Sequence, residues 1–175
     1  EIRENCPGLT MQDLNAARET LPFLNTYSAG KLVKTYAVVS GDRESDAEVS
    51  GVMFTCNPVS GDPSIVAIDA SWGLGLGVVG GEVTPDEYLV SKVTREVVRR
   101  TVNHKAIEHR PDESGRGTVR LDVPDERAHA ACLDEDALRS LVDAARTVER
   151  HFGCHQDIEW AIAHDGPLFV LQSRP

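Results

Sequence analysis

The chain has 175 residues, with 18 Lys and Arg against 28 Asp and Glu, and a formal net charge of −10. This length and a hydrophobic content of 41% are typical of one globular domain with a packed core. The chain contains no apolar run of the ~18 residues that a membrane helix needs, and its first residues lack the basic and apolar regions of a secretory signal. We therefore expect no membrane partner, and the acidic balance argues against nucleic acid, whose phosphates would be repelled.

The four cysteines are widely separated, and no two of them have C-x-x-C spacing. They are Cys6, Cys56, Cys132 and Cys154. This pattern indicates neither a zinc ribbon nor a disulfide framework, so the sequence predicts reduced thiols and a cytoplasmic location.

The first part of the chain, residues 1–48, is predicted to be an N-terminal extension whose role the sequence leaves open. A helix is expected over residues 10–20, where Thr10 could serve as the N-cap, and Pro22 would end it. A short strand is expected over residues 34–39, followed by a charged loop over residues 41–48.

The second part, residues 49–175, carries stronger signals. Turn residues separate several apolar, β-branched runs, which are typical of strands. Expected strands cover residues 49–55, 64–70, 88–93, 96–102 and 118–122. Between them we expect a turn at residues 57–63, a glycine-rich loop at 71–87 and a polar loop at 109–117.

The clearest helix is predicted over residues 134–152. Apolar residues recur there at steps of three and four: Leu138, Leu141, Val142, Ala145, Val148 and Phe152. Acidic residues at the start and basic residues at the end match the helix dipole, and Gly153 is a suitable C-cap. Strands over residues 157–163 and 168–174 follow, so the sequence predicts an α+β fold with a mainly antiparallel sheet and packed helices.

The last two strands form a predicted hairpin whose faces differ. In the segment DIEWAIA, Asp157 and Glu159 share one face, and the other face is apolar. A four-residue loop would pair Ala163 with Leu168 and thereby place Glu159 opposite Gln172 and Asp157 opposite Arg174. On the reverse face the same register pairs Trp160 with Leu171 and Ile162 with Phe169.

The predicted patch of Asp157, Glu159, Gln172 and Arg174 has a chemical meaning. Carboxylate and amide oxygens are hard ligands suited to Mg²⁺, which commonly shares its shell with substrate phosphates. A neighbouring guanidinium can hold a phosphate through paired hydrogen bonds. The alternative is an exposed polar face on which Asp157 and Arg174 form only a surface ion pair.

Three glycines, Gly75, Gly77 and Gly80, match the letters of a dinucleotide fingerprint. The context differs, because further glycines and Pro85 interrupt the segment in which a helix should follow. Two interpretations remain open: a loop whose backbone N–H groups face a ligand, or a wide connection between strands. We likewise expect His151, Cys154 and His155 to form a solvated helix end instead of a metal site.

The order of the motifs resembles a known family. The motifs are GVMFTCNPVSGDP (51–63), SWGLGLGVVGGEVTPDEY (71–88), RRTVNHK (99–105), DIEWAI (157–162) and LQSRP (171–175). Together they resemble the C-terminal part of the ATP-binding domain of phosphoenolpyruvate synthase and pyruvate phosphate dikinase. Rifampicin phosphotransferase and phenylphosphate synthase share that domain.

The resemblance implies an ATP-grasp fold in which Mg²⁺ and ATP bind between two subdomains. A histidine on a separate swivelling domain would take the β-phosphoryl group, giving AMP and phosphate, and would pass it to pyruvate or another acceptor. Carried over by motif, Glu159 and Gln172 are Mg²⁺ and ATP ligands, Asp157 is a supporting catalytic carboxylate and Arg174 is a phosphate contact.

The chain also departs from the family pattern. Family members usually carry an acidic residue directly after G-L-G, where this chain has Leu76. The lysine-bearing K-G-x-N-L and arginine-bearing V-R-S-S-A segments are absent from the sequence, and residues 36–39 are its candidate for the adenine-binding hinge strand.

Three functions therefore compete. The first is the ATP-binding part of a dikinase-type phosphotransferase, which needs the N-terminal half of the ATP site and a phosphohistidine domain as partners, in the same protein or another subunit. The second is a non-catalytic regulatory or interaction module that retains half of the site; Leu76 and the missing segments favour it. The third, a purely structural domain, leaves the hairpin patch without a role.

Overall fold

The computed structural model describes residues 27–28, 31–32, 47–112, 117–164, 166 and 168–175. The predicted helix over residues 10–20, the strand over 34–39 and the candidate hinge strand lie outside these residues. A short two-stranded sheet pairs β1 (Tyr27–Ser28) with β2 (Lys31–Leu32).

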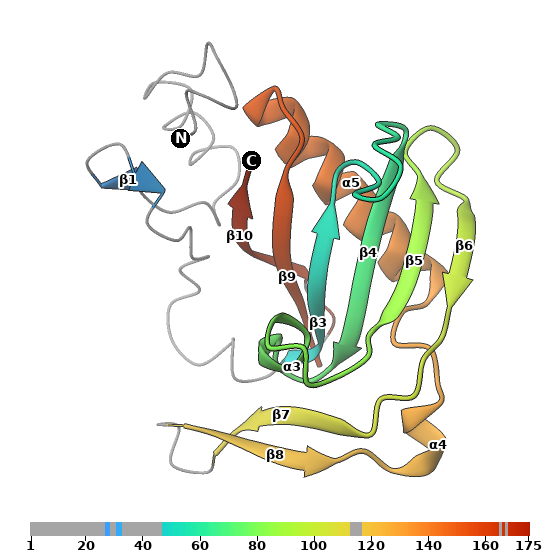
Figure 1. Ribbon diagram of the computed structural model, residues 1–175, viewed down its shortest axis with the longest axis vertical. Coiled ribbons are helices and arrows are strands. Elements are labelled where there is room, and N and C mark those ends of the chain that lie inside the picture. The colour runs from blue at the N-terminus through green and yellow to red at the C-terminus, as the bar shows by residue number, and fades with distance from the viewer. Residues whose placement is uncertain (1–26, 29–30, 33–46, 113–116, 165, 167) are drawn as a thin grey trace.

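The centre of the fold is a six-stranded antiparallel sheet in the order β10-β9-β3-β4-β5-β6 (Figure 1). Its strands are β3 (Ala47–Phe54), β4 (Ile65–Trp72), β5 (Asp86–Ser91), β6 (Val97–Thr101), β9 (Asp157–Ala163) and β10 (Leu168–Arg174). The predicted strands of residues 49–175 are thus confirmed within a few residues at each end. The mainly antiparallel α+β architecture is confirmed as well, and it is consistent with an ATP-grasp-like domain.

Helix α5 (Glu135–Phe152) lies across one face of the sheet (Figure 1). Its predicted apolar stripe is buried completely: Leu138, Leu141, Val142, Ala145, Val148 and Phe152. Asp134 caps the N-terminus by accepting a hydrogen bond from the backbone N–H of Ala137 at 2.8 Å. Gly153, with φ of 68°, ends the helix in the left-handed conformation that the sequence predicts.

The side chains that face α5 are apolar, and they come from every second residue of the sheet strands. Ile158 and Trp160 on β9 and Ile68 on β4 are completely buried in the same core as α5. Alternation along these strands therefore turns Asp157, Glu159 and Asp69 to the opposite face. Among the described helices, only the short helix α3 lies on that second face, at one end of it (Figure 1).

That short helix, α3 (Leu76–Val79), lies within the glycine-rich stretch, where the sequence predicts a loop. The stretch is held at the sheet because Ser50 Oγ donates to the carbonyl of Gly73, and Leu74 N donates to the carbonyl of His109 at 2.9 Å. Gly73 has φ of 73°, and a Cβ atom there would lie 2.4 Å from the His109 carbonyl oxygen, so only glycine fits. The stretch contains one four-residue helix and therefore lacks the long helix that follows the strand in a dinucleotide site. This agrees with the prediction from the sequence.

A second hairpin joins β7 (Ile107–Pro111) to β8 (Thr118–Asp122) and projects from the main sheet (Figure 1). Strand β8 is confirmed, but the prediction of a polar loop from residue 109 is wrong, because His109 and Arg110 continue β7. Their side chains make contacts that the sequence pattern does not reveal: His109 Nε2 lies 3.2 Å from Glu82 Oε2, and Arg110 donates to the carbonyl of Ala47 at 2.9 Å. The one-turn helix α4 (Asp125–Ala128), not predicted either, follows β8.

A buried ion pair joins Asp86 on β5 to Lys105, and both side chains are completely buried. The Asp86 carboxylate also accepts hydrogen bonds from Tyr88 Oη and from the backbone N–H groups of Asn103 and Cys132, at 2.8 to 3.2 Å. Every partner of this charge is thus supplied by the protein itself, and the pair ties β5 to the segments before β7 and α5.

The cysteines differ from the expectation of four reduced thiols. Cys56 and Cys132 are free, but Cys154 is disulfide-bonded, so that prediction is wrong for Cys154. Among the described residues, no helix is both long and apolar enough to cross a membrane.

Candidate functional site

The β9–β10 hairpin brings the predicted site residues together. Gln172 is the cross-strand partner of Glu159, and Arg174 is the partner of Asp157. All four side chains stand on the sheet face opposite α5, because the alternate residues Ile158 and Trp160 point into the core. The predicted patch is therefore present in the structure.

The predicted register is wrong on the loop side of the hairpin. Leu168 pairs with Ile162, Phe169 with Ala161 and Val170 with Trp160, and the register shifts between Val170 and Gln172. This shift leaves Leu171 as the extra residue of a β-bulge, so that Val170 and not Leu171 packs in the core. Residues 168–171 on β10 form an unbroken apolar run, so alternation along this strand gives no signal for the inserted residue.

Within the patch, Asp157 and Arg174 form a two-pronged ion pair. The Arg174 Nε and Nη2 atoms lie 2.7 and 2.6 Å from Asp157 Oδ2. The Arg174 side chain is 53% exposed, so the guanidinium is held in place by the carboxylate while its outer edge stays accessible. This is the arrangement of a cation positioned to receive an anion.

Glu159 and Gln172, by contrast, are half-buried and have no side-chain hydrogen-bond or ion-pair partner among the residues that the structure describes. A carboxylate and an amide placed side by side offer oxygen ligands to a hard cation. In the described ranges, no group of three or more His, Cys, Asp or Glu side chains could hold a metal ion by itself. The donor set thus fits a Mg²⁺ ion that completes its shell with phosphate oxygens and water.

The neighbouring strands add two acidic residues that the sequence analysis did not select. Glu159 and Asp69 both pair with Val52 of the intervening strand β3, and Asp69 in turn pairs with Glu87 on β5. With strands ~4.8 Å apart, Asp69 lies about 10 Å from Glu159 across the same face. A sequence signal existed, because Asp69 interrupts an otherwise apolar buried strand, but only the strand order places it beside the hairpin.

Asp69 occupies an unfavourable place for a charge. Burial, and secondarily the negative charge of Glu87, raise the pKa of Asp69 from its usual value to about 6. Glu87 is exposed and paired with Arg99 at 3.1 Å, whereas Asp69 has no ion-pair partner in the described part of the chain. A bound cation would relieve this repulsion.

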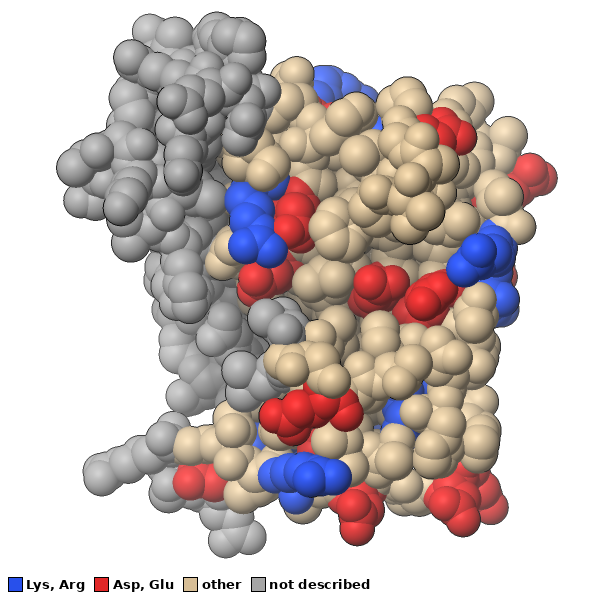
Figure 2. All heavy atoms as spheres, viewed as in Figure 1, with Lys and Arg blue, Asp and Glu red and all other residues tan. Residues whose placement is uncertain are grey.

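The charges on this face follow the order of the strands. From β10 to β6 they run from Arg174, through Asp157 and Glu159, to Asp69 and Glu87, and end at Arg99. Figure 2, which views the face opposite α5, shows acidic side chains across the middle of the sheet with basic side chains toward both sides. This arrangement could hold cations over the centre and receive phosphate oxygens at the edge.

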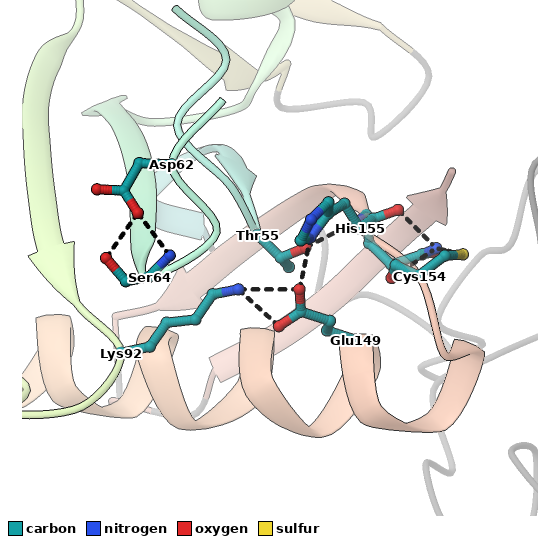
Figure 3. A network of polar contacts seen from close by, with 8 residues as sticks. Thr55, Asp62, Ser64, Lys92, Glu149, Cys154 and His155 are labelled. Atoms are coloured by element: carbon teal, nitrogen blue, oxygen red, sulfur yellow. Dashed lines mark hydrogen bonds and ion pairs between the residues drawn. The ribbon is translucent and has the colours of Figure 1, made fainter. Parts of the chain in front are cut away.

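The end of α5 is a separate polar region. Lys92 and His155 approach Glu149 from two sides, at 2.7 and 2.6 Å (Figure 3). A pocket of about 370 Å³ adjoins this contact, lined by Glu149, Gly153, Cys154, His155 and Pro175. The described residues form no metal cluster here, and the expected absence of a metal site at this helix end stays a prediction.

Comparisons with known proteins show the family of the chain. The family described as "Pyruvate phosphate dikinase, AMP/ATP-binding domain" matches residues 33–175. A probable phosphoenolpyruvate synthase of Methanothermobacter thermautotrophicus is 43% identical over 142 residues, which cover 81% of this chain and 20% of that protein. The phosphoenolpyruvate synthase of Pyrococcus furiosus is 39% identical over 148 residues, covering 81% of this chain and 18% of that protein.

A relative that is not named as a phosphoenolpyruvate synthase is also similar to this chain. The prodigiosin synthesizing transferase PigC of Serratia marcescens is 40% identical over 130 residues, covering 74% of this chain and 14% of that protein. The chain thus spans no more than 20% of the length of these relatives, and each of them contains a large additional part. The chain belongs to the family of the pyruvate phosphate dikinase AMP/ATP-binding domain.

Proposed function

We propose that this chain supplies the C-terminal half of a Mg²⁺–ATP site in a dikinase-type phosphotransferase. In this proposal the β-phosphoryl group of ATP passes to a histidine on another domain or subunit, water takes the γ-phosphoryl group as phosphate, and AMP is released. The phosphohistidine then passes its phosphoryl group to pyruvate or another acceptor. The Methanothermobacter and Pyrococcus relatives are named as phosphoenolpyruvate synthases, which supports the reaction class. The name of the Serratia relative is the reason to leave the acceptor open.

One observation carries the proposal: Asp157, Glu159, Gln172 and Arg174 are cross-strand neighbours on the sheet face opposite α5. We assign Glu159 and Gln172 as ligands of a Mg²⁺ ion that bridges to the ATP phosphates. The ion would offset phosphate charge as the β-phosphoryl group is transferred.

Asp157 and Arg174 act as a unit in this proposal. Arg174 contacts a phosphate through the exposed edge of its guanidinium, and Asp157 fixes the orientation of that guanidinium through the two short contacts. The patch is acidic overall, so Mg²⁺ and Arg174 together are what would admit a polyphosphate to this surface.

The alternative function is a regulatory or interaction module that retains half of an ATP-grasp site. Leu76 favours it, since the resemblance places an acidic residue at this position. The catalytic function, by contrast, requires the lysine and arginine segments to come from elsewhere in the protein or from a partner subunit.

A thermal-melting experiment separates the two functions. We expect Mg²⁺ with a non-hydrolysable ATP analogue to raise the melting temperature when the N-terminal half of the site is supplied, and not with this chain alone. Glu159→Ala should abolish the shift, because the ion loses its carboxylate ligand. Equal shifts for the wild type and Glu159→Ala would contradict the metal-ligand assignment, and no shift under either condition would favour the regulatory module.

A further inference from the structure

Two histidines lie side by side away from the residues assigned to the nucleotide. His104 is in the connection between β6 and β7, and His129 is the C-cap residue of α4. The centroids of their rings are 4.5 Å apart, and the ring planes are inclined by 36°. Both residues are exposed, and neither ring has a hydrogen-bond or ion-pair partner among the residues that the structure describes. The pair is therefore accessible to a ligand from solution.

The fold fixes the two segments that carry these histidines. The backbone N–H of Lys105 donates to the carbonyl of Ala128 at 3.0 Å, and these two residues are the immediate chain neighbours of the histidines. Both of them are completely buried. The buried Asp86 carboxylate holds both segments as well, because it accepts a backbone N–H from each, at 2.9 and 2.8 Å. The histidine backbones are thus held together while their rings reach the solvent.

Stabilisation of the fold does not account for this pair. Without an acidic partner in the described part of the chain, protonation of both rings would bring two positive charges together at this separation. Imidazole nitrogen is, however, a common protein ligand of metal ions, and it suits zinc, copper and nickel. Two imidazoles on rigid neighbouring segments offer such an ion two ligands at once.

The distance between the rings fits ligation of one ion. A bond of about 2 Å from each nitrogen to a tetrahedral ion places the centroids of two imidazole rings about 5 Å apart. The observed separation of 4.5 Å is close to this value, and exposed rings can rotate until one nitrogen of each faces a common point. No third His, Cys, Asp or Glu joins the pair within the described ranges, so water would fill the remaining coordination positions.

We propose that His104 and His129 together bind one divalent transition-metal ion such as Zn²⁺. The ion takes one nitrogen from each ring and links the β6–β7 connection to the end of α4. Its nitrogen ligands select a different class of metal from the oxygen ligands Glu159 and Gln172, which suit Mg²⁺. This site is separate from the proposed nucleotide function, because none of the residues assigned to ATP or Mg²⁺ takes part in it.

Equilibrium dialysis of the full-length protein that carries this chain tests the proposal. The buffer contains micromolar Zn²⁺ and a millimolar excess of Mg²⁺, and bound zinc is counted by atomic absorption. We expect His104→Ala and His129→Ala each to bind one zinc ion fewer per chain than the wild type, and the double variant to lose no further ion. This non-additive loss is the signature of one ion shared by two ligands.

Thermal melting provides a second readout. Zinc should raise the melting temperature of the wild type more than that of either single variant, because the ion binds the folded site and is released on unfolding. Both histidines are exposed, so the circular dichroism of each variant without zinc should match that of the wild type.

His164→Ala is the matched control, because it removes another histidine, whose side chain is 75% exposed, after the end of β9. It should bind as much zinc as the wild type. Equal zinc content in the wild type and both single variants would overturn the proposal and reduce the pair to a packing contact. A double variant that loses two ions would show independent binding and exclude the shared site. An equal loss in His164→Ala would mean that exposed histidines bind zinc without a specific site.

Discussion

Two carboxylates of the same sheet, Asp86 and Asp69, are treated differently by the fold. Asp86 is completely buried, yet Lys105, Tyr88 and two backbone N–H groups satisfy its charge. Asp69 is only half-buried, lies beside another carboxylate and has no described partner. The comparison teaches that burial alone does not mark a functional charge: a charge whose partners are all internal supports the fold, and one left without partners is available to a ligand.

The largest effect should come from breaking the satisfied pair. Lys105→Met leaves the Asp86 carboxylate buried without its cation, and the expected loss in the free energy of unfolding is about 3 to 5 kcal/mol. Urea denaturation followed by circular dichroism measures it. A loss below ~1 kcal/mol would mean that Asp86 is not a structural charge and would remove the contrast with Asp69.

The next largest effect should be a loss of nucleotide affinity when Glu159, on the sheet face opposite α5, is substituted. Glu159→Gln keeps the size and polarity of the side chain but removes its charge, so we expect the affinity for the Mg²⁺–ATP analogue to fall by roughly 30-fold, about 2 kcal/mol. The unfolding free energy should stay within about 0.5 kcal/mol of the wild type, because Glu159 makes no described contact that the fold depends on. Isothermal titration calorimetry and urea denaturation give the two quantities. Glu48→Gln, at a half-buried glutamate on β3, is a control whose affinity should not change, and an equal loss in both variants would remove the assignment of Glu159.

Asp69→Asn should change the free energy of unfolding in the opposite direction and raise stability in the absence of ligand. The pKa of Asp69 in the folded protein is about 6, above its ordinary value of 3.8, so the folded state binds this proton more tightly than the unfolded state. Stability is therefore lost as the pH rises through this interval, and the loss is complete above about pH 6. We expect the variant to be more stable than the wild type by about 1 to 2 kcal/mol near pH 7, and the gain to vanish near pH 4.

Urea denaturation across this pH range checks the prediction. A gain that does not depend on pH would show that packing, and not the charge of Asp69, is responsible. Stabilisation by loss of charge is expected at a position that is kept for binding at a cost to the fold.

The smallest effect should come from the exposed ion pair. A double-mutant cycle of Asp157→Asn and Arg174→Gln should give a coupling free energy of about 0 to 1 kcal/mol for unfolding, because solvent screens a pair with a 53% exposed arginine. Each single variant should nevertheless weaken binding of the nucleotide analogue. A coupling energy above ~2 kcal/mol would instead make the pair a structural element like Asp86 and Lys105.

Much of the fold was predictable because its elements have strong local signals. Helix α5 combines a continuous apolar stripe with Asp134 and Gly153 as caps, and the structure confirms each of these features. Strand β7 was missed, because its His109 and Arg110 are polar and their partners, Gly73 and Ala47, are far away in sequence. The bulge at Leu171 was missed because residues 168–171 form an unbroken apolar run, in which alternation gives no sign of an inserted residue.

The sequence predicted the hairpin partners Glu159 with Gln172 and Asp157 with Arg174. The structure has these pairs because the bulge at Leu171 compensates for a loop-side register that is offset by one residue from the predicted one. The sequence by itself also determined that a mainly antiparallel sheet would bury one face under a helix. Only the tertiary structure decided that β3 separates β9 from β4, and with it that Asp69 shares a surface with Glu159. Strand order between distant segments depends on how whole faces pack, and no local periodicity encodes it.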